Sequence, residues 1–307
     1  MPRLCPSSPF VAVTLLLAAL GGLAAGAGPK RLHRERSAFN DILVTESARG
    51  RRVLQFEVGG DEQSVIWLDD PRGLALAYTR ATMAALAVVP EPRRALMIGL
   101  GGGTMATFLH QRYPELHIDC VEIDPAVVEV AKRFFAFKPD ARMRVHVGDG
   151  RRFVERSKDH YDLVILDAYG ADNIPLHLAT EEFLRAVRAR LTPGGVVASN
   201  VIERELNPRY DDMVRTFSAV FDELYALGAD ANRLLFALPR RERLTRADLA
   251  QRAAKLQRQR AFGFDLAKML RRGLEHPVEF QEGARVMRDA DLASSRPAPG
   301  GDHRKKR

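Results

Sequence analysis

Short apolar segments alternate with helical patterns between residues 94 and 202, and this alternation constrains the fold more than any other feature. Segments of strand length lie at 95–99, 117–124, 142–150, 161–169 and 194–202. Helical patterns separate several of them, at 104–112, 125–137 and 180–191. Strands that are apolar throughout are buried on both faces, which is typical of a parallel sheet between two helix layers. The sequence therefore predicts an α/β fold with helices on both faces of one sheet.

The flanking sequence extends this core on both sides. Residues 41–68 are β-rich and punctuated by Gly and Asp, residues 74–89 and 209–227 show helical patterns, and residues 233–239 form a late strand. We predict a signal peptide or membrane anchor with a basic flank at 1–36, a β-rich subdomain at 37–73, the main α/β domain at 74–240, a helical extension at 241–287 and a disordered basic tail at 288–307.

Residues 9–28 carry no charge and are rich in Leu, Ala and Val. Such a run fits a signal peptide with a small-residue cleavage site at 25–27, or an uncleaved anchor that just spans a bilayer. Four basic residues follow it within residues 30–36, and the positive-inside rule would keep the body after them in the cytoplasm. We therefore expect a membrane-associated protein with a cytoplasmic body, with export after cleavage as the alternative.

Composition excludes several classes of function. The net charge of +8 includes +3 from residues 29–36 and +3 from 288–307, so the rest of the chain is nearly balanced and we expect no nucleic-acid partner. The basic residues of 244–307 fit a solvated helix face, with anionic lipid or nucleic acid as the alternative ligand. Two cysteines, Cys5 and Cys120, provide neither a disulfide framework nor a cysteine-based zinc site, and we expect no metal.

A glycine-rich loop follows the first strand of the alternating region and precedes a helix. Its sequence is Gly-Leu-Gly-Gly-Gly from Gly99 to Gly103. Glycines allow the backbone to approach a ligand closely, and the following helix offers free N–H groups. Thr104 stands where the dinucleotide fingerprint requires glycine, and the loop has no Walker lysine. The loop thus indicates a nucleotide site that is neither of these two types.

Acidic residues follow the next strands at their carboxyl ends. Glu122 can accept both hydroxyls of a ribose, while Asp124 is expected to cap the following helix. Asp149 can accept the exocyclic amine of an adenine or belong to an ordinary Asp-Gly turn. Asp167 can hold or deprotonate an amine or simply begin a loop. Because these features share one edge of a parallel sheet, together they predict a site for an adenosine compound beside an amine.

These motifs resemble a class I S-adenosylmethionine-type Rossmann domain, through G-L-G-G-G, V-E-I-D, G-D-G, Y-D-L-V-I-L-D and L-T-P-G-G-V. The upstream D-I-L-V-T-E-S and G-R-R-V-L-Q-F segments and the helix with Tyr78 resemble the spermidine synthase (polyamine aminopropyltransferase) family, and the likeness spans about 38–240. The resemblance implies nucleoside contacts at Asn40, Gly99, Gly101, Gly103, Glu122, Ile123, Asp149, Gly150 and Pro175. It implies Asp167 as the catalytic proton acceptor and Tyr78, Tyr169 and Asp172 in the acceptor pocket.

Three departures concern the acceptor side. Gly102 replaces an Asp that grips a substrate amine in the family, Thr79 follows the matched tyrosine in place of an amide or His, and Gly170 replaces a second Asp unless Asp172 serves instead. A polycation needs carboxylates in place of water, and each lost charged hydrogen bond costs roughly 1.5–3 kcal/mol. Without an Asp at position 102, the carboxylate of intact S-adenosylmethionine is no longer repelled.

The resemblance implies transfer of an aminopropyl group from decarboxylated S-adenosylmethionine to a small amine, by an enzyme that could form a homodimer. A methyltransferase that uses S-adenosylmethionine, or a non-catalytic nucleoside-binding module, remains as an alternative.

Overall fold

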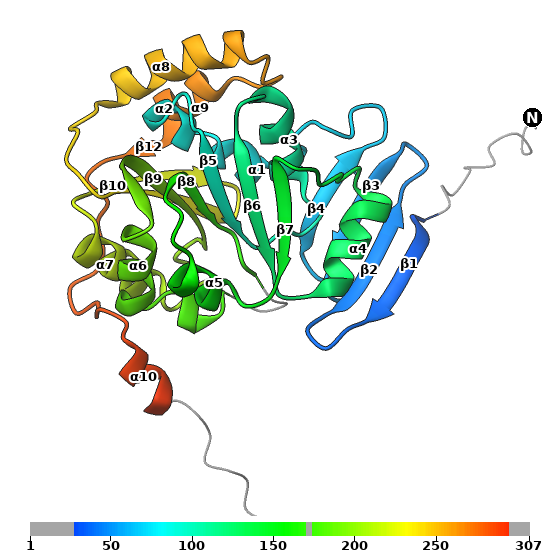
Figure 1. Ribbon diagram of the computed structural model, residues 1–307, viewed down its shortest axis with the longest axis horizontal. Helices are drawn as coiled ribbons and strands as arrows, with labels where there is room; N and C mark the ends of the chain where they lie inside the picture. The colour runs from blue at the N-terminus through cyan, green and yellow to red at the C-terminus, as the bar shows by residue number, and fades with distance from the viewer. Residues whose placement is uncertain (1–27, 170–173, 295–307) are drawn as a thin grey trace, which may run out of the picture.

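The computed structural model describes residues 28–169 and 174–294, which form two sheets (Figure 1). The first is a four-stranded antiparallel sheet in the order β1-β2-β3-β4. Its strands are β1 (Lys30–Arg36), β2 (Asp41–Glu46), β3 (Arg51–Gln55) and β4 (Glu62–Trp67).

The second sheet has eight strands in the order β12-β10-β11-β9-β8-β5-β6-β7. Its strands are β5 (Arg94–Ile98), β6 (His117–Glu122), β7 (Met143–Val147), β8 (Tyr161–Leu166), β9 (Leu191–Ile202), β10 (Glu223–Ala229), β11 (Asn232–Leu238) and β12 (Leu274–Glu275). Strands β5 to β9 pair in parallel, and β10, β11 and β12 pair antiparallel. The predicted α/β fold with a mostly parallel sheet is thus confirmed.

Helices cover both faces of the large sheet (Figure 1). They are α1 (Ala77–Thr82), α2 (Ala85–Val88), α3 (Thr104–Arg112), α4 (Pro125–Phe134), α5 (Gly150–Arg156), α6 (Glu181–Arg188), α7 (Tyr210–Val220), α8 (Arg246–Gln259), α9 (Leu266–Gly273) and α10 (Asp289–Ser294), with a 3-10 turn at Leu176–Leu178. Leu96 and Val164 face the core under α6 and α7, whereas the adjacent Met97 and Ile165 face the core under α3 and α8. Burial of successive residues on opposite faces explains why these strands are apolar throughout.

The small sheet packs on α4. Ile42, Val44 and Leu54 of the sheet share a buried cluster with Val127 and Val130 of that helix. Because α4 follows β6, this contact holds the small sheet over the edge where the parallel strands end.

Three predicted boundaries were wrong. The basic flank at 29–36 is strand β1, whose Arg34 pairs with Asp41 at 2.7 Å, so the β-rich subdomain begins at Lys30. The helix predicted over 209–227 ends at Val220, and Glu223–Ala229 is a strand paired with β11. The tail expected to be disordered from 288 includes α10, where Asp289 binds Arg151 at 2.5 Å.

The predicted anchor or signal at 9–28 lies, apart from Gly28, outside the described residues. Within 28–169 and 174–294 no helix is long and apolar enough to cross a bilayer.

Candidate active site

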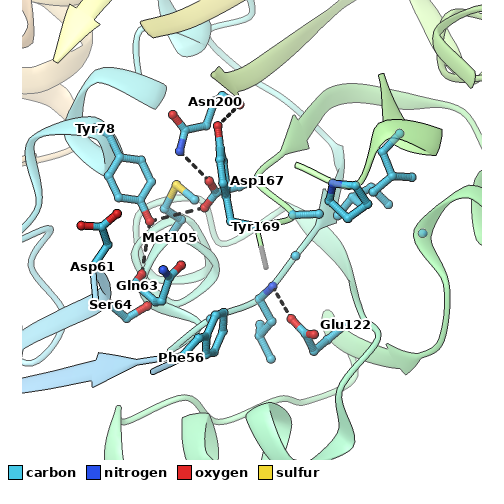
Figure 2. A pocket seen from close by; sticks show the side chains of 18 of the residues that line it. Phe56, Asp61, Gln63, Ser64, Tyr78, Met105, Glu122, Asp167, Tyr169 and Asn200 are labelled. Carbon is cyan, nitrogen blue, oxygen red and sulfur yellow. Dashed lines mark hydrogen bonds between the residues drawn. The ribbon is translucent and has the colours of Figure 1, made fainter. Parts of the chain in front are cut away.

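A cavity of about 860 Å³ lies where the parallel strands end, between the large sheet, the small sheet and α1 (Figure 2). Open α/β sheets bind ligands at this edge. The cavity wall includes eleven of the predicted site residues: Asn40, Tyr78, Gly99, Gly101, Glu122, Ile123, Asp149, Gly150, Asp167, Tyr169 and Pro175. Gly103 does not line it, and Asp172 lies outside the described residues.

Gly99 begins the loop with φ +94°, in the left-handed region. A Cβ atom there would stand 2.2 Å from the carbonyl oxygen of Asp167, so only glycine allows this approach. Gly103 has φ +68° at the N-cap of α3, and a Cβ there would meet the ring of Phe137 at 2.5 Å. Gly103 is therefore required for the turn and its packing, and its predicted ligand contact stays a prediction.

Gly102 has a structural reason to be glycine in this chain. Its amide donates to Ser64 Oγ at 2.7 Å, and a Cβ atom would stand 2.9 Å from both Ser64 and the buried Phe135. An aspartate at this position would require both neighbours to move. The small sheet thus occupies, through Ser64, the space beside the loop.

Glu122 ends β6 and is 8% exposed. Its Oε2 accepts the amide of Leu100 at 2.9 Å and its Oε1 accepts that of Asp124 at 3.0 Å. Burial raises its pKa above the ordinary value, although the backbone amides favour the charged form. Each oxygen retains a lone pair for a hydroxyl donor.

Asp124 caps α4, as predicted, by accepting the amide of Ala126 at 3.0 Å. Its other oxygen accepts from Ser37 Oγ at 2.5 Å and from Asn40 Nδ2 at 2.8 Å. Asn40 is thereby fixed on the cavity wall by its own amide group.

Asp149 is both a helix cap and a cavity residue. It accepts the amide of Arg152 at 2.9 Å and lies 2.9 Å from His177 Nε2. Burial acts to raise the pKa of Asp149, but the Arg152 amide and His177 outweigh it, so the pKa lies below its ordinary value. The carboxylate is therefore charged at the end of the cavity near Gly150.

Asp167 follows β8 and is held by two side chains on opposite sides (Figure 2). Its Oδ1 accepts from Asn200 Nδ2 at 2.9 Å, and its Oδ2 lies 3.5 Å from the hydroxyl of Tyr78. Burial raises the pKa of Asp167 to about 7, although both neighbours favour the carboxylate. A carboxyl group with a pKa near neutrality can act as a proton acceptor there.

The two tyrosines stay protonated beside this carboxylate. Burial and the charge of Asp167 raise the pKa of both Tyr78 and Tyr169. The single hydroxyl proton of Tyr78 is shared between Asp167 and the carbonyl of Gln63, which lies 3.3 Å from the hydroxyl oxygen, and Tyr169 donates to the carbonyl of Asn200 at 2.9 Å. Tyr78 and Tyr169 therefore line the cavity and donate hydrogen bonds, and neither acts as a base.

Sequence reasoning did not identify Asn200. This residue is 4% exposed, and its Oδ1 accepts no hydrogen bond from the described residues, although it lines the cavity. A buried acceptor without a partner costs free energy unless a ligand supplies a donor. An amide near the end of a mostly apolar strand was the signal that could have identified it.

The acceptor side also holds carboxylates that the sequence did not suggest. Asp61 lies beside Tyr78 in Figure 2, is exposed, and has no ion pair with the residues of 28–169 and 174–294. Asp230 lies on the same cavity wall. Among the described residues, 28–169 and 174–294, no group of three or more His, Cys, Asp or Glu side chains could hold a metal ion.

Comparisons with known proteins identify relatives of this chain. Residues 77–224 match the family described as "Spermine/spermidine synthase domain". A polyamine aminopropyltransferase from Vibrio vulnificus is 37% identical over 199 residues, which are 63% of this chain and 66% of that protein. An eEF1A lysine and N-terminal methyltransferase from Bos taurus is 33% identical over 187 residues, 54% of this chain and 27% of the relative.

A solved structure is similar as well. Human methyltransferase-like protein 13, crystallised in complex with SAH, is 30% identical with a TM-score of 0.56, over 61% of this chain and 93% of that one. The matched region thus covers under two thirds of the Vibrio relative and about a quarter of the bovine one.

Proposed function

Because the chain belongs to the spermine/spermidine synthase domain family, we propose that it transfers an aminopropyl group from decarboxylated S-adenosylmethionine to a small amine. Asp167 is the proton acceptor in this proposal. The observation that carries it is the pair formed by Asp167 and Asn200, a carboxylate of raised pKa beside a buried amide oxygen that lacks a donor.

The nucleoside half of the cavity fits an adenosyl compound. Glu122 would accept the ribose hydroxyls, because its position is fixed by two backbone amides. Asp149 would accept the exocyclic amine of the adenine, and Gly99 and Gly101 allow the backbone to approach the ligand. An adenosyl sulfonium supplies a carbon atom that bears a good leaving group.

At the other end, Asp167 and Asn200 would hold the attacking nitrogen. A new bond forms between the amine nitrogen and the carbon next to the sulfur, and the carbon–sulfur bond breaks to leave a neutral thioether. The nitrogen becomes positively charged, and Asp167 accepts its proton. The protein thus contributes mainly position and proton removal.

Asp61 and Asp230 support an amine as the acceptor. Both carboxylates line the cavity on the side of Tyr78 and β11 and could replace, in part, the acidic residues that Gly102 and Gly170 do not provide. Hydrogen bonds from an ammonium group to a carboxylate are stronger than those between neutral groups.

Methyl transfer from intact S-adenosylmethionine is the second candidate. Gly102 favours it, because position 102 carries no carboxylate that would repel that of the methionine moiety. The likeness to methyltransferases of 30–33% identity supports it too.

Calorimetric titration of the full chain separates these candidates. Decarboxylated and intact S-adenosylmethionine and methylthioadenosine are compared, with Glu122→Ala as the variant that weakens the nucleoside site. Preference for the decarboxylated compound supports aminopropyl transfer, and preference for the intact one supports methyl transfer. If none of the three compounds bound, both candidate reactions would be contradicted. The protein would then be a module that does not bind the family's usual ligand.

A further inference from the structure

The segment formed by α8 and α9 carries a concentration of positive charge. Residues 240–273, which comprise α8, α9 and the loops next to them, contain eleven Lys or Arg and three Asp or Glu, a net of +8, which equals the net charge of the whole chain. Without its two basic ends the chain has a net charge close to zero, because its other parts are acidic and offset the positive charge of this segment.

One side of this helical hairpin packs in the hydrophobic core. Leu249 and Leu256 of α8 and Leu266 and Leu270 of α9 are buried against the large sheet and α2. The opposite side is exposed along the outer edge of the molecule (Figure 1).

Seven exposed cations on this hairpin and the loop before α8 form no ion pair or hydrogen bond through their side chains with the residues of 28–169 and 174–294. They are Arg241, Arg243, Lys255, Arg258, Lys268, Arg271 and Arg272, here called the basic hairpin face. Lys268, Arg271 and Arg272 are spaced i, i+3 and i+4, so they lie on one side of α9. By contrast, Arg246 and Arg260 donate to the carbonyls of Leu274 and Arg112 and hold the hairpin in place.

The chemistry of this face fits a surface of phosphate groups. None of the large apolar side chains that are exposed in the described part of the chain lies on the hairpin. It therefore has neither a wedge that could insert into lipid nor an aromatic platform on which bases could stack. Contact through guanidinium and ammonium groups alone suits an array of anionic headgroups.

We propose that the basic hairpin face binds the anionic surface of a membrane. The uncharged run at 9–28, which the sequence predicts to meet a membrane, would supply a second contact. One hydrophobic segment combined with a polybasic surface gives firmer attachment than either alone. This inference does not depend on the reaction proposed above.

Vesicle co-sedimentation of the full chain tests the proposal. The quantity measured is the ratio of binding to vesicles of equal parts phosphatidylglycerol and phosphatidylcholine over binding to phosphatidylcholine alone. This ratio cancels the contribution of the apolar run. The test variant replaces Lys255, Arg258, Lys268 and Arg271 by Gln. The matched control replaces Arg49, Arg133, Arg156 and Lys158, four exposed cations away from the hairpin, by Gln.

Each basic side chain held near an anionic surface strengthens binding by about fivefold. We expect the test variant to lose the preference for anionic vesicles by about tenfold or more, while the control changes by less than about threefold. High salt should also abolish the preference. Unchanged thermal unfolding and nucleoside binding in both variants would show that they remain folded.

Equal losses in the two variants would overturn the proposal, because net charge alone would then explain the binding. A wild-type chain without preference for anionic vesicles would overturn it as well. So would a labelled RNA or DNA oligonucleotide that binds through these four residues while anionic vesicles do not, since the partner would then be a nucleic acid.

Discussion

Replacing Asn200 by Ala removes the amide that holds the Asp167 carboxylate. The bond that is lost runs from Asn200 Nδ2 to Asp167 Oδ1 at 2.9 Å. A hydrogen bond to a charged group contributes about 1.5–3 kcal/mol, and one pKa unit corresponds to about 1.4 kcal/mol. Because this bond favours the carboxylate, its loss should move the pKa of Asp167 from about 7 to roughly 8–9.

The assay is the rate of transfer as a function of pH, between about pH 6 and pH 10, with one amine acceptor throughout. Activity that needs the carboxylate falls as the pH drops below its pKa. We expect Asn200→Ala to be about 5–50-fold slower than wild type near pH 7 and to recover much of the difference at alkaline pH. Asn232→Ala, which changes another amide on the cavity wall, should keep the wild-type profile.

An acid limb that stays near pH 7 in Asn200→Ala would refute this reasoning. A loss of the same size at every pH would also contradict it, since Asn200 would then act only by contacting the substrate or by supporting the fold.

Three further substitutions test the remaining parts of the site. Asp167→Asn should abolish transfer yet raise the melting temperature at pH 8, because the raised pKa means that the buried charge costs stability as the pH rises from about 4 to 7; a lower melting temperature at pH 8 would speak against this. Glu122→Gln should weaken nucleoside binding about 10–100-fold in calorimetry, because one of the two oxygens that each accept a backbone N–H becomes an NH2 group, which cannot accept; unchanged affinity would remove Glu122 from the site. Gly102→Asp should destabilise the protein by about 1–3 kcal/mol in denaturant unfolding, since Phe135 and Ser64 occupy the space, and an unchanged midpoint would show that the loop adapts freely.

The central sheet could be predicted because its strands are buried on both faces. Leu96 and Met97 are adjacent and both buried, on opposite sides of β5, which makes the strand apolar without interruption. Glycine and acidic residues at the ends of such strands then fall on one edge by topology alone. This is why residues as distant as Gly99 and Asp149 could be assigned to one site.

Features that depend on pairing between distant segments could not be predicted from the sequence in the same way. Strand β1 is mostly charged and exposed, and it is a strand because it pairs with β2. The region 223–229 continues a helical pattern, but its pairing with β11 makes it a strand. The role of Asn200 is evident only from its distance to Asp167. The role of the charged hairpin is evident only from the exposure of its side chains.

The proposed role of Asp167 is to accept a proton from an amine that attacks an adenosyl sulfonium. It is tested most directly by mixing the full chain with labelled decarboxylated or intact S-adenosylmethionine and a diamine, and by following the labelled product for wild type and Asp167→Asn. We predict an aminopropylated product from the decarboxylated donor in wild type, and binding of that donor without product in Asp167→Asn. Transfer at the wild-type rate in Asp167→Asn would contradict the account.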